Sequence, residues 1–501
     1  MKFNTFIKKS NFYFYPIMAF ILPFFIRLIP EIIAWPYPIG FDTLMYANVI
    51  LEGTYLQKNL IELFKSTSLF YIISIAINKI LGNVFLTIKI LGPILFSILC
   101  YMLYLYSKRV LKWEFWKCFM VSLLASIYFV SLRISWEMYR QMLGFIFLII
   151  GLIALRIKNV KLRILIVMLS GFLTTWSHEL AAVLFFIIMI IHFFIEKEIR
   201  AKAYIFLMVM PAFILFIYQL YNPIIGNIGV PYERIVSFSF IDTAIFISGF
   251  LIYILLPILP LIILGAFSLK GIDIWSWLIT CLIFSYWPLF LPEYSIILWF
   301  RWALLLVYPA IFLSIEGFWK LLNYGRKIVW KFNIGKILAL LILLLNLIMS
   351  SYYLLSLPEN QAWKYFGEWN NYKQFIQTSM LQNSISISDT PSVVEAIKWI
   401  DKKIAGNDSV LILHEAIDNW ARIFIHKNKI IRINEVNLSS PIRENIEKIL
   451  IRLSEENIKN GKKVYTIWWI EGKGWYNMLK LPSQFKEIKC FDNIGIFQYT
   501  P

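Results

Sequence analysis

Residues 84–107 read VFLTIKILGPILFSILCYMLYLYS, an apolar run that is long enough to cross the roughly 30 Å hydrocarbon core of a membrane as one helix. Ten further runs of this kind lie near 12–34, 116–134, 138–156, 162–177, 179–195, 203–221, 240–268, 274–291, 295–317 and 334–357. The sequence therefore predicts an α-helical polytopic membrane protein with about 11 spans. A shorter apolar run at 67–81 is expected to be a juxtamembrane or re-entrant segment.

The composition supports this class of protein. Of the 501 residues, 59% are hydrophobic and 16% are charged, and the mean hydropathy is +0.69. Soluble domains carry about a quarter charged residues, so a soluble globule is excluded. The four cysteines show no paired spacing, which excludes a zinc knuckle and a disulfide framework. The sequence also lacks a Walker loop, a Rossmann glycine triplet, HExxH and GxSxG, which argues against an ATP-driven pump and a membrane metalloprotease.

Most of the net charge of +18 lies in the apolar part of the chain. Residues 1–357 carry 29 Lys and Arg against 14 Asp and Glu, whereas residues 358–501 carry 19 against 16. The nearly balanced tail argues against a nucleic-acid partner. Because basic residues concentrate in cytoplasmic loops, we expect a cytoplasmic N-terminus, which puts 20 of those 29 residues inside and the tail outside the cell membrane. Twelve spans with an external N-terminus stay open, and they also put the tail outside.

Three regions follow from these patterns. Residues 1–357 form the transmembrane region, in which 35–82 is the first outer loop with juxtamembrane helices. Residues 358–390, rich in Trp, Tyr, Asn and Ser, are typical of an interfacial linker. Residues 391–501 are predicted to form a small extracytoplasmic α/β domain, because helical and strand patterns alternate there. The strands are expected at 409–414, 429–433 and 463–469.

The first outer loop carries a lone carboxylate, Asp42, after two prolines and a glycine in the sequence WPYPIGFD. Asp42 opens a helical stretch, and Tyr46 follows one turn later. Two interpretations stay open. Asp42 is either the N-cap of an interfacial helix or a functional group, since ionisable residues at membrane depth are costly to keep.

Residues 133–140, RISWEMYR, form a second charged outer turn. On one helix Arg133, Glu137 and Arg140 would share a face. This turn is either a salt-bridged structural element or a pair of guanidinium groups that bind a phosphate in bidentate fashion.

Two more outer positions carry charge. His178 and Glu179 lie in a very short turn between two spans, as structural residues or as part of an acceptor or metal site. Arg301 follows Trp299-Phe300 inside the tenth span, where a cation requires a buried anion or a watery cavity.

With acids and arginines on several outer turns, the chain resembles the GT-C superfamily of integral-membrane glycosyltransferases, particularly the protein-O-mannosyltransferase-like members and their archaeal and bacterial relatives. The matching features are an anchor helix before a long outer loop with Gly40-Phe41-Asp42 and Tyr46, the segment 67–81, the turn 133–140, the His178-Glu179 turn, the number of spans and the external tail domain.

The resemblance implies a GT-C-like fold in which residues 1–357 are the catalytic domain. It also implies inverting transfer of a sugar, of the hexosyl or mannosyl kind, from a polyprenyl-phosphate-linked donor in the membrane lipid to a protein, lipid or glycan acceptor. Asp42 would take the place of the family's first-loop acid, as general base or metal ligand. The residues that would bind the donor phosphate are Arg133, Arg140, Arg301, Tyr46 and Glu137, and those for the acceptor or a metal are His178 and Glu179.

The chain departs from the family's pattern in two places. Protein mannosyltransferases carry an Asp-Glu pair where this chain has Asp42-Thr43, and oligosaccharyltransferases carry a second acidic pair where it offers only Glu137. A divalent metal such as Mg²⁺ or Mn²⁺ and the absence of any cofactor are therefore equally compatible with the sequence. Trp468-Trp469 is similar to the start of the oligosaccharyltransferase WWDYG signature, but the Asp and Tyr are missing, so we interpret it as a core strand.

Two other functions stay open. A transporter or flippase for lipid-linked sugars would hold the phosphate with the same arginines, although the sequence shows no repeated halves. A non-catalytic membrane assembly subunit is the other alternative, and it predicts that Asp42 and the arginines tolerate replacement.

The topology can be tested by cysteine labelling. In a chain whose native cysteines are replaced by serine, a cysteine introduced near Asn407 should react with a membrane-impermeant reagent added to intact cells, because the tail is expected outside. A cysteine near Lys327, in a predicted cytoplasmic loop, is the matched control and should stay unlabelled until the cells are opened. The reverse pattern would separate Asp42 from the compartment assigned to it.

Overall fold

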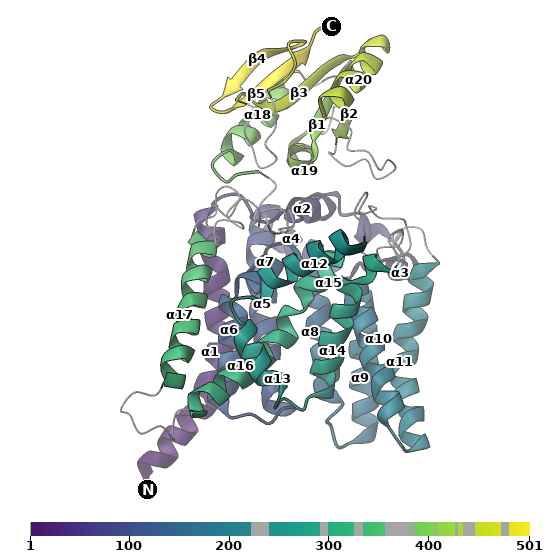
Figure 1. Ribbon diagram of the computed structural model, residues 1–501. Helices are drawn as coiled ribbons and strands as arrows, with labels where there is room; N and C mark the ends of the chain where they lie inside the picture. Colours follow the sequence, from purple (N-terminus) through teal and green to yellow (C-terminus); the bar gives the residue numbers. More distant parts are fainter. Residues whose placement is uncertain are drawn as a thin grey trace.

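The computed structural model describes residues 2–221, 240–290, 299–324, 334–355, 380, 385–404, 406, 408–425, 429–433, 446–471 and 480–501. Long helices form one bundle, and a five-stranded sheet with its helices stands on one end of it (Figure 1). The N-terminus of α1 lies at the opposite end. We call the bundle end that faces the sheet the tail side.

Not every helix of the bundle is long and apolar enough to span a membrane. Seven of the described helices are long and apolar enough to cross, or up to nine if each of two bent helix pairs is one span. The predicted class, a polytopic helical membrane protein with a small C-terminal α/β domain, is confirmed, whereas the number of 11 spans stays a prediction. The bundle contains α1 (Lys2–Ile33), α2 (Thr43–Glu52), α3 (Leu60–Phe64), α4 (Leu69–Leu81), α5 (Val84–Arg109), α6 (Phe115–Ile127), α7 (Phe129–Glu137), α8 (Tyr139–Ala154), α9 (Val160–Ser177), α10 (Glu179–Ile195), α11 (Ile199–Leu220), α12 (Phe240–Leu255), α13 (Leu259–Ala266), α14 (Ile272–Ser285), α15 (Trp299–Leu305), α16 (Val307–Tyr324) and α17 (Ile334–Leu355).

Two of the predicted continuous spans are bent. The run 116–134 consists of α6 and α7, which meet at 64°, and the run 240–268 consists of α12 and α13, which meet at 90°. Pro257 and Pro260 explain the second bend, because proline lacks the amide hydrogen of a helix and restrains the residue before it. At the first bend Tyr128 adopts extended dihedral angles, φ −73° and ψ 125°.

The carbonyls freed at the two bends are bound by nearby side chains. The hydroxyl of Tyr128 donates to the Ile254 carbonyl at 2.5 Å. On α17, Asn346 donates to the Pro257 carbonyl at 3.3 Å and Ser350 donates to the Ile127 carbonyl. Because the hydrocarbon core holds no water to take the place of these donors, they allow the bends to persist inside the membrane.

The segment predicted as juxtamembrane or re-entrant is α4. Its 13 residues extend about 20 Å at 1.5 Å per residue, which is less than the hydrocarbon core requires. It packs against α2, α5, α8 and α9, toward the tail side of the bundle (Figure 1).

The C-terminal domain is a mixed sheet covered by helices. Its elements are α18 (Thr390–Lys403), β1 (Ser409–His414), α19 (Glu415–Phe424), β2 (Lys429–Ile433), α20 (Ile446–Lys459), β3 (Lys463–Trp469), β4 (Phe485–Phe491) and β5 (Ile494–Tyr499). The strand order is β2-β1-β3-β5-β4, with β1 parallel to β2 and β3 and the β4–β5 hairpin antiparallel. The three predicted strands coincide with β1, β2 and β3, and Trp468 and Trp469 are buried in β3 as expected. Most of the predicted linker 358–390 lies outside the described residues.

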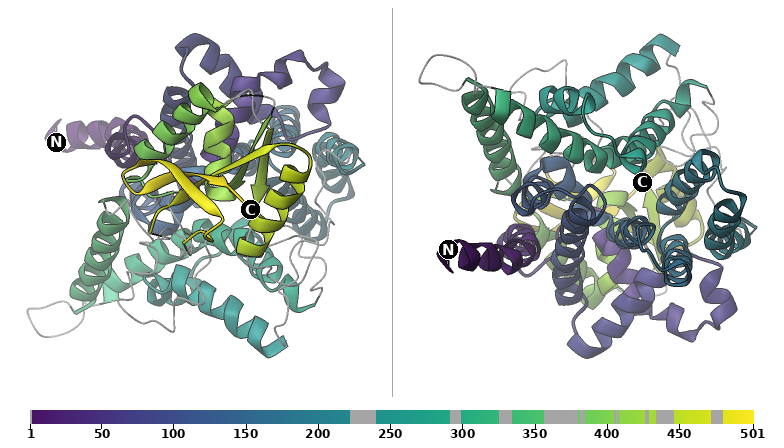
Figure 2. Two further views of the ribbon diagram at one scale, coloured as in Figure 1. Left: turned by 90° about the horizontal axis from the view of Figure 1, so that it is seen from above. Right: turned by 90° about the horizontal axis from the view of Figure 1, so that it is seen from below.

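The C-terminal domain contacts the loop between α1 and α2, and the helices α2 and α5, through α19. Trp420 contacts Tyr37 and Phe85 edge-on or tilted, with ring centroids 5.6 and 6.2 Å apart. Asn48 of α2 donates to the Asn419 carbonyl at 3.1 Å. Seen from above, the domain lies over the middle of the bundle (Figure 2). The loop that contains Asp42 is therefore enclosed between the bundle and the C-terminal domain.

The stability of the C-terminal domain should fall in mild acid because of His414. Burial, with a smaller contribution from Arg432, lowers the pKa of His414 from 6.5 to about 3. The unfolded chain takes up the proton below pH 6.5 and the folded domain does not, so stability is lost as the pH falls through this range. We expect a loss of about 2 kcal/mol at pH 5, measured by denaturant unfolding at pH 7.5 and 5.0 with hydrogen exchange in β1 as the readout.

The matched control is His414→Asn. His414 caps α19 by accepting a hydrogen bond from the Ala416 amide at 3.2 Å, and asparagine can also accept at an N-cap but does not titrate. The loss of stability between pH 7.5 and 5.0 should be smaller in this variant by the same amount, about 2 kcal/mol. An equal loss in both proteins would assign the acid sensitivity to other groups.

Candidate functional site

Asp42 lies on the tail side at the start of α2, about a quarter exposed. It occupies the N-cap position with φ −82° and ψ −9°, but its side chain makes no capping hydrogen bond. Its Oδ2 atom lies 3.5 Å from Nη2 of Arg301 on α15. Asp42 thus occupies the N-cap position without capping through its side chain, and its carboxylate is paired with a guanidinium group.

The loop before Asp42 is fixed by Gly40. This residue has φ +106°, and a Cβ atom there would lie 2.0 Å from the Trp136 carbonyl of α7. The Thr43 hydroxyl donates to the Gly40 carbonyl at 2.7 Å. Only glycine permits this close approach of two backbones, which sets Asp42 beside the end of α7.

The prediction that Arg133, Glu137 and Arg140 share one face of a single helix is wrong. The helix breaks at Met138, with φ −90° and ψ 51°, so Arg140 belongs to α8. Arg133 and Glu137 form a buried ion pair at 2.5 Å, and the Arg133 side chain is only 1% exposed. The structure therefore supports the salt-bridged interpretation for this pair and separates Arg140 from it.

Arg140 contacts a different set of groups. Its Nη2 atom lies 3.3 Å from Oε2 of Glu179 and donates to the hydroxyl of Thr67, and its guanidinium carbon lies 5.7 Å from the ring centre of Tyr71. The side chain of Arg140 is 21% exposed. Arg140 thus lies between the short α4 helix and the turn that joins α9 to α10.

His178 is the N-cap of α10. Its Nδ1 atom accepts a hydrogen bond from the Leu180 amide at 3.1 Å, and its Nε2 atom lies 3.9 Å from Oε1 of Glu179. One ring nitrogen is therefore engaged in a structural role. In the part of the chain that the structure describes, there is no group of three or more His, Cys, Asp and Glu side chains that could hold a metal ion.

Arg301 lies near both Asp42 and the charged residues at the start of α10. Besides its ion pair with Asp42, it lies within electrostatic range of Glu137, His178 and Glu179. The side chain is 24% exposed. Acidic groups from α2, α7 and the turn between α9 and α10 thus lie near one arginine.

Tyr46 lies beneath Asp42, one turn along α2, and is buried. Its ring stacks on Tyr139 at 5.6 Å and meets Phe70 and Tyr71 edge-on. Burial, with the neighbouring Asp42 charge, raises the pKa of Tyr46 well above its usual value. Its hydroxyl therefore stays protonated, and its ring is packed among three other aromatic rings.

Several residues of this region were not predicted from the sequence. They are Thr67, which binds Arg140, and a buried charge cluster of Arg27, Glu31 and Lys89, which contacts the first loop. The signal was present, because Lys89 is a lone charge inside an apolar run and Arg27 and Glu31 have the four-residue spacing of a helical ion pair.

Comparison with known proteins identifies solved structures that share the fold of this chain. No family model and no curated protein matches the sequence. Among solved structures, ArnT from Cupriavidus metallidurans in the apo state superposes with a TM-score of 0.53 over 98% of both chains, at 10% identity. The same protein bound to undecaprenyl phosphate gives a TM-score of 0.50 over 97% of both chains, also at 10% identity. The arabinofuranosyltransferase AftD from Mycobacteria matches 85% of this chain and 35% of its own, with 11% identity and a TM-score of 0.43, a similarity too low to bear on the fold.

Gly40→Ala should destabilise the protein more than a glycine substitution in open space. The added methyl group would meet both the unfavourable backbone angle and the Trp136 carbonyl, for a combined loss of about 3 kcal/mol. Gly53→Ala is the control, since Gly53 also has a positive φ, +61°, but has no atom within 4 Å of the added Cβ. It should lose only about 1 kcal/mol. Thermal unfolding in detergent measures both, and equal losses would contradict the close contact with α7.

Proposed function

We propose that this chain, which has the GT-C fold, transfers a sugar from a polyprenyl-phosphate-linked donor to an acceptor hydroxyl with inversion at the anomeric carbon. The observation that carries the proposal is the Asp42–Arg301 pair. A carboxylate free of capping and a partly exposed guanidinium group meet at 3.5 Å on the tail side of a membrane bundle.

A lipid-phosphate donor is supported by the comparison. ArnT, which has the same fold, has been solved with undecaprenyl phosphate bound. A polyprenyl chain would lie in the membrane alongside the bundle, while its phosphate would reach the charged groups near α2 and α15. A guanidinium group suits this phosphate, because its planar array of donors matches two phosphate oxygens.

The proposed reaction requires one base and one anion-binding group. Asp42 accepts the proton of the acceptor hydroxyl while the oxygen attacks the anomeric carbon. The bond from that carbon to the phosphate oxygen breaks, and its electron pair leaves with the polyprenyl phosphate. Negative charge grows on the departing phosphate, and Arg301 and Arg140 stabilise it there.

The three candidate arginines take different roles in this proposal. Arg301 and Arg140 are partly exposed and close to the loop, so they are assigned to the phosphate. Arg133 is locked to Glu137 in the interior, so its role is to hold the end of α7 in place. His178 and Glu179 border the acceptor side, where Glu179 also orients Arg140.

The proposal also covers the sugar, the acceptor and the orientation of the chain in the membrane. A hexosyl sugar rests on the resemblance of the first-loop motif to protein mannosyltransferases. The acceptor is a protein, lipid or glycan on the extracytoplasmic side, where the distribution of basic residues puts the C-terminal domain. The N-terminus is expected in the cytoplasm on the same argument.

Asp42→Asn should abolish transfer without harming the fold. Because the Asp42 side chain makes no capping hydrogen bond, the neutral amide should leave thermal stability nearly unchanged. Loss of a general base costs on the order of 10²–10⁴ in rate. Binding of undecaprenyl phosphate should be kept, since Arg301 loses only its competing carboxylate. The measurements are sugar transfer from a panel of undecaprenyl-phosphate-linked hexoses in native membranes, and undecaprenyl phosphate binding in detergent.

Two variants frame this experiment. Glu52→Gln, at the exposed end of the same helix, should keep both transfer and binding, whereas Arg301→Ala should weaken undecaprenyl phosphate binding. Transfer by Asp42→Asn at close to the parental rate would remove the proposed base. Movement of the donor across the membrane without release of its sugar would indicate a flippase instead.

A further inference from the structure

A cluster of three charged side chains lies near the end of α1, below the first loop (residues 34–42). Arg27 and Glu31 of α1 pair at 2.9 Å, and Lys89 of α5 lies 3.3 Å from the other oxygen of Glu31. All three are almost completely buried, with exposed fractions of 4% or less. Charges in such an environment are expensive to desolvate, so a cluster of this kind needs a compensating role.

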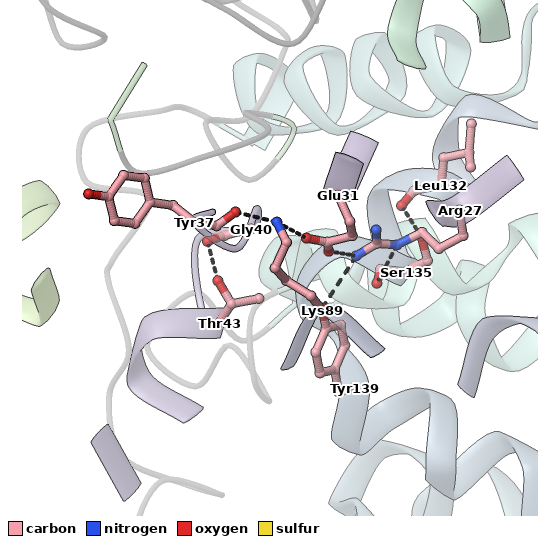
Figure 3. Close-up of polar contacts among 9 residues, drawn as sticks. All are labelled: Arg27, Glu31, Tyr37, Gly40, Thr43, Lys89, Leu132, Ser135 and Tyr139. Carbon is pink, nitrogen blue, oxygen red and sulfur yellow. Dashed lines mark hydrogen bonds and ion pairs between the residues drawn. The ribbon is translucent and has the colours of Figure 1, made fainter. Parts of the chain in front are cut away.

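The cluster binds two segments of the site through their polar groups. Lys89 Nζ donates to the Tyr37 carbonyl of the first loop at 2.5 Å (Figure 3). Arg27 donates to the Ser135 carbonyl of α7 and to the Tyr139 hydroxyl of α8, each at 3.3 Å. The same cluster therefore contacts the loop that carries Asp42 and the turn that carries Glu137 and Arg140.

The space for these contacts is kept by Gly92 on α5. A Cβ atom at this position would lie 2.6 Å from the Tyr139 hydroxyl and 3.0 Å from Nη2 of Arg27. Tyr139 in turn stacks on Tyr46, one turn after Asp42. The cluster thus reaches α2 by a second route, through two tyrosine rings.

The charges are not balanced, and this identifies Lys89 as the distinctive member. Arg27 and Glu31 alone would form a neutral pair, which is the less costly arrangement to bury. Lys89 adds a second cation that the pair does not need. Its further contacts are the Tyr37 carbonyl and the ring of Trp35 at 5.5 Å, and both belong to the loop.

Between Tyr37 and Asp42 the loop is short and held at two points. Lys89 holds it at Tyr37, and the contact of Gly40 with the Trp136 carbonyl holds it two residues before Asp42. A loop anchored in this way can offer little freedom to the Asp42 carboxylate. The position of a general base decides its efficiency, because proton transfer requires hydrogen-bond distance to the acceptor hydroxyl.

From this geometry we infer that Lys89 is a positioning residue, which holds the first loop through the Tyr37 carbonyl so that Asp42 meets the acceptor hydroxyl. The inference rests on the proposed function for its effect on transfer, but the anchoring of the loop can be measured without it. Lys89 touches neither donor nor acceptor in this arrangement, so it acts on the rate through Asp42.

Lys89→Met and Lys89→Gln test this role. The two replacements have side chains of similar length, and both remove the charge and leave the neutral Arg27–Glu31 pair, but only glutamine can still donate to the Tyr37 carbonyl. In Lys89→Met we expect hydrogen exchange of residues 37–42 to rise at least tenfold, with thermal stability unchanged or higher. The turnover of an undecaprenyl-phosphate-linked hexose should fall about 10- to 100-fold, with KM for this probe within threefold. Lys89→Gln should lie between Lys89→Met and the parental protein in both measurements.

The control is Lys79→Met, which removes an exposed lysine from α4 and should match the parental protein. Unchanged exchange of residues 37–42 in Lys89→Met would overturn the inference. So would failure of both Lys89 variants to fold, because Lys89 would then be needed for the bundle and not for the loop. If the loop loses protection while even the parental protein transfers no hexose, the anchoring stands and the proposed function fails.

Discussion

A backbone carbonyl without a partner inside a membrane is the constraint on which this structure depends. Two of the predicted spans are bent within the described bundle, and each bend leaves carbonyls that water cannot reach. Tyr128, which lies at the first bend, and Asn346 and Ser350 of α17 donate to these carbonyls. Tyr128 stands at one break and binds the last turn of the helix at the other, so the two bends stabilise each other. α17 supplies the remaining donors, which gives this otherwise exposed helix a structural role.

The bend between α6 and α7 has a direct consequence for the candidate site. It directs α7 so that the Trp136 carbonyl meets Gly40 and the Ser135 carbonyl meets Arg27. The first loop is then bounded by α7 on one side, Lys89 of α5 below, and Trp420 of the C-terminal domain above. The local sequence of the first loop does not determine where the loop lies. Its position is fixed by contacts with three elements that are far apart along the chain.

The sequence predicted some parts of this arrangement better than others. The strands β1, β2 and β3 were predicted with their observed bounds, because each is a short β-branched or aromatic run between turn residues. The bends were not predicted, since hydropathy reports the length of a span and not its direction. Pro257 and Pro260 were a usable signal for one of them, but no proline or glycine marks the breaks at Tyr128 and Met138. Pairing of Asp42 with Arg301 joins residues 259 positions apart, which only the packed bundle can bring together.

The exposure of the three candidate arginines distinguishes their proposed roles more clearly than their sequence neighbourhoods do. Arg133 and Glu137 form a pair that neither donor nor acceptor can reach, and breaking such a buried pair would cost about 3–5 kcal/mol. Asp42 and Arg301 are each about a quarter exposed, so a phosphate can compete for the guanidinium group at a much smaller cost. In the resting protein these two groups neutralise each other, and neither is left as an uncompensated charge at the membrane surface. In the proposed reaction, a donor phosphate that binds Arg301 would release the carboxylate of Asp42 beside the sugar. The same ion pair that stabilises the empty site would then prepare the proposed base only when the donor is bound.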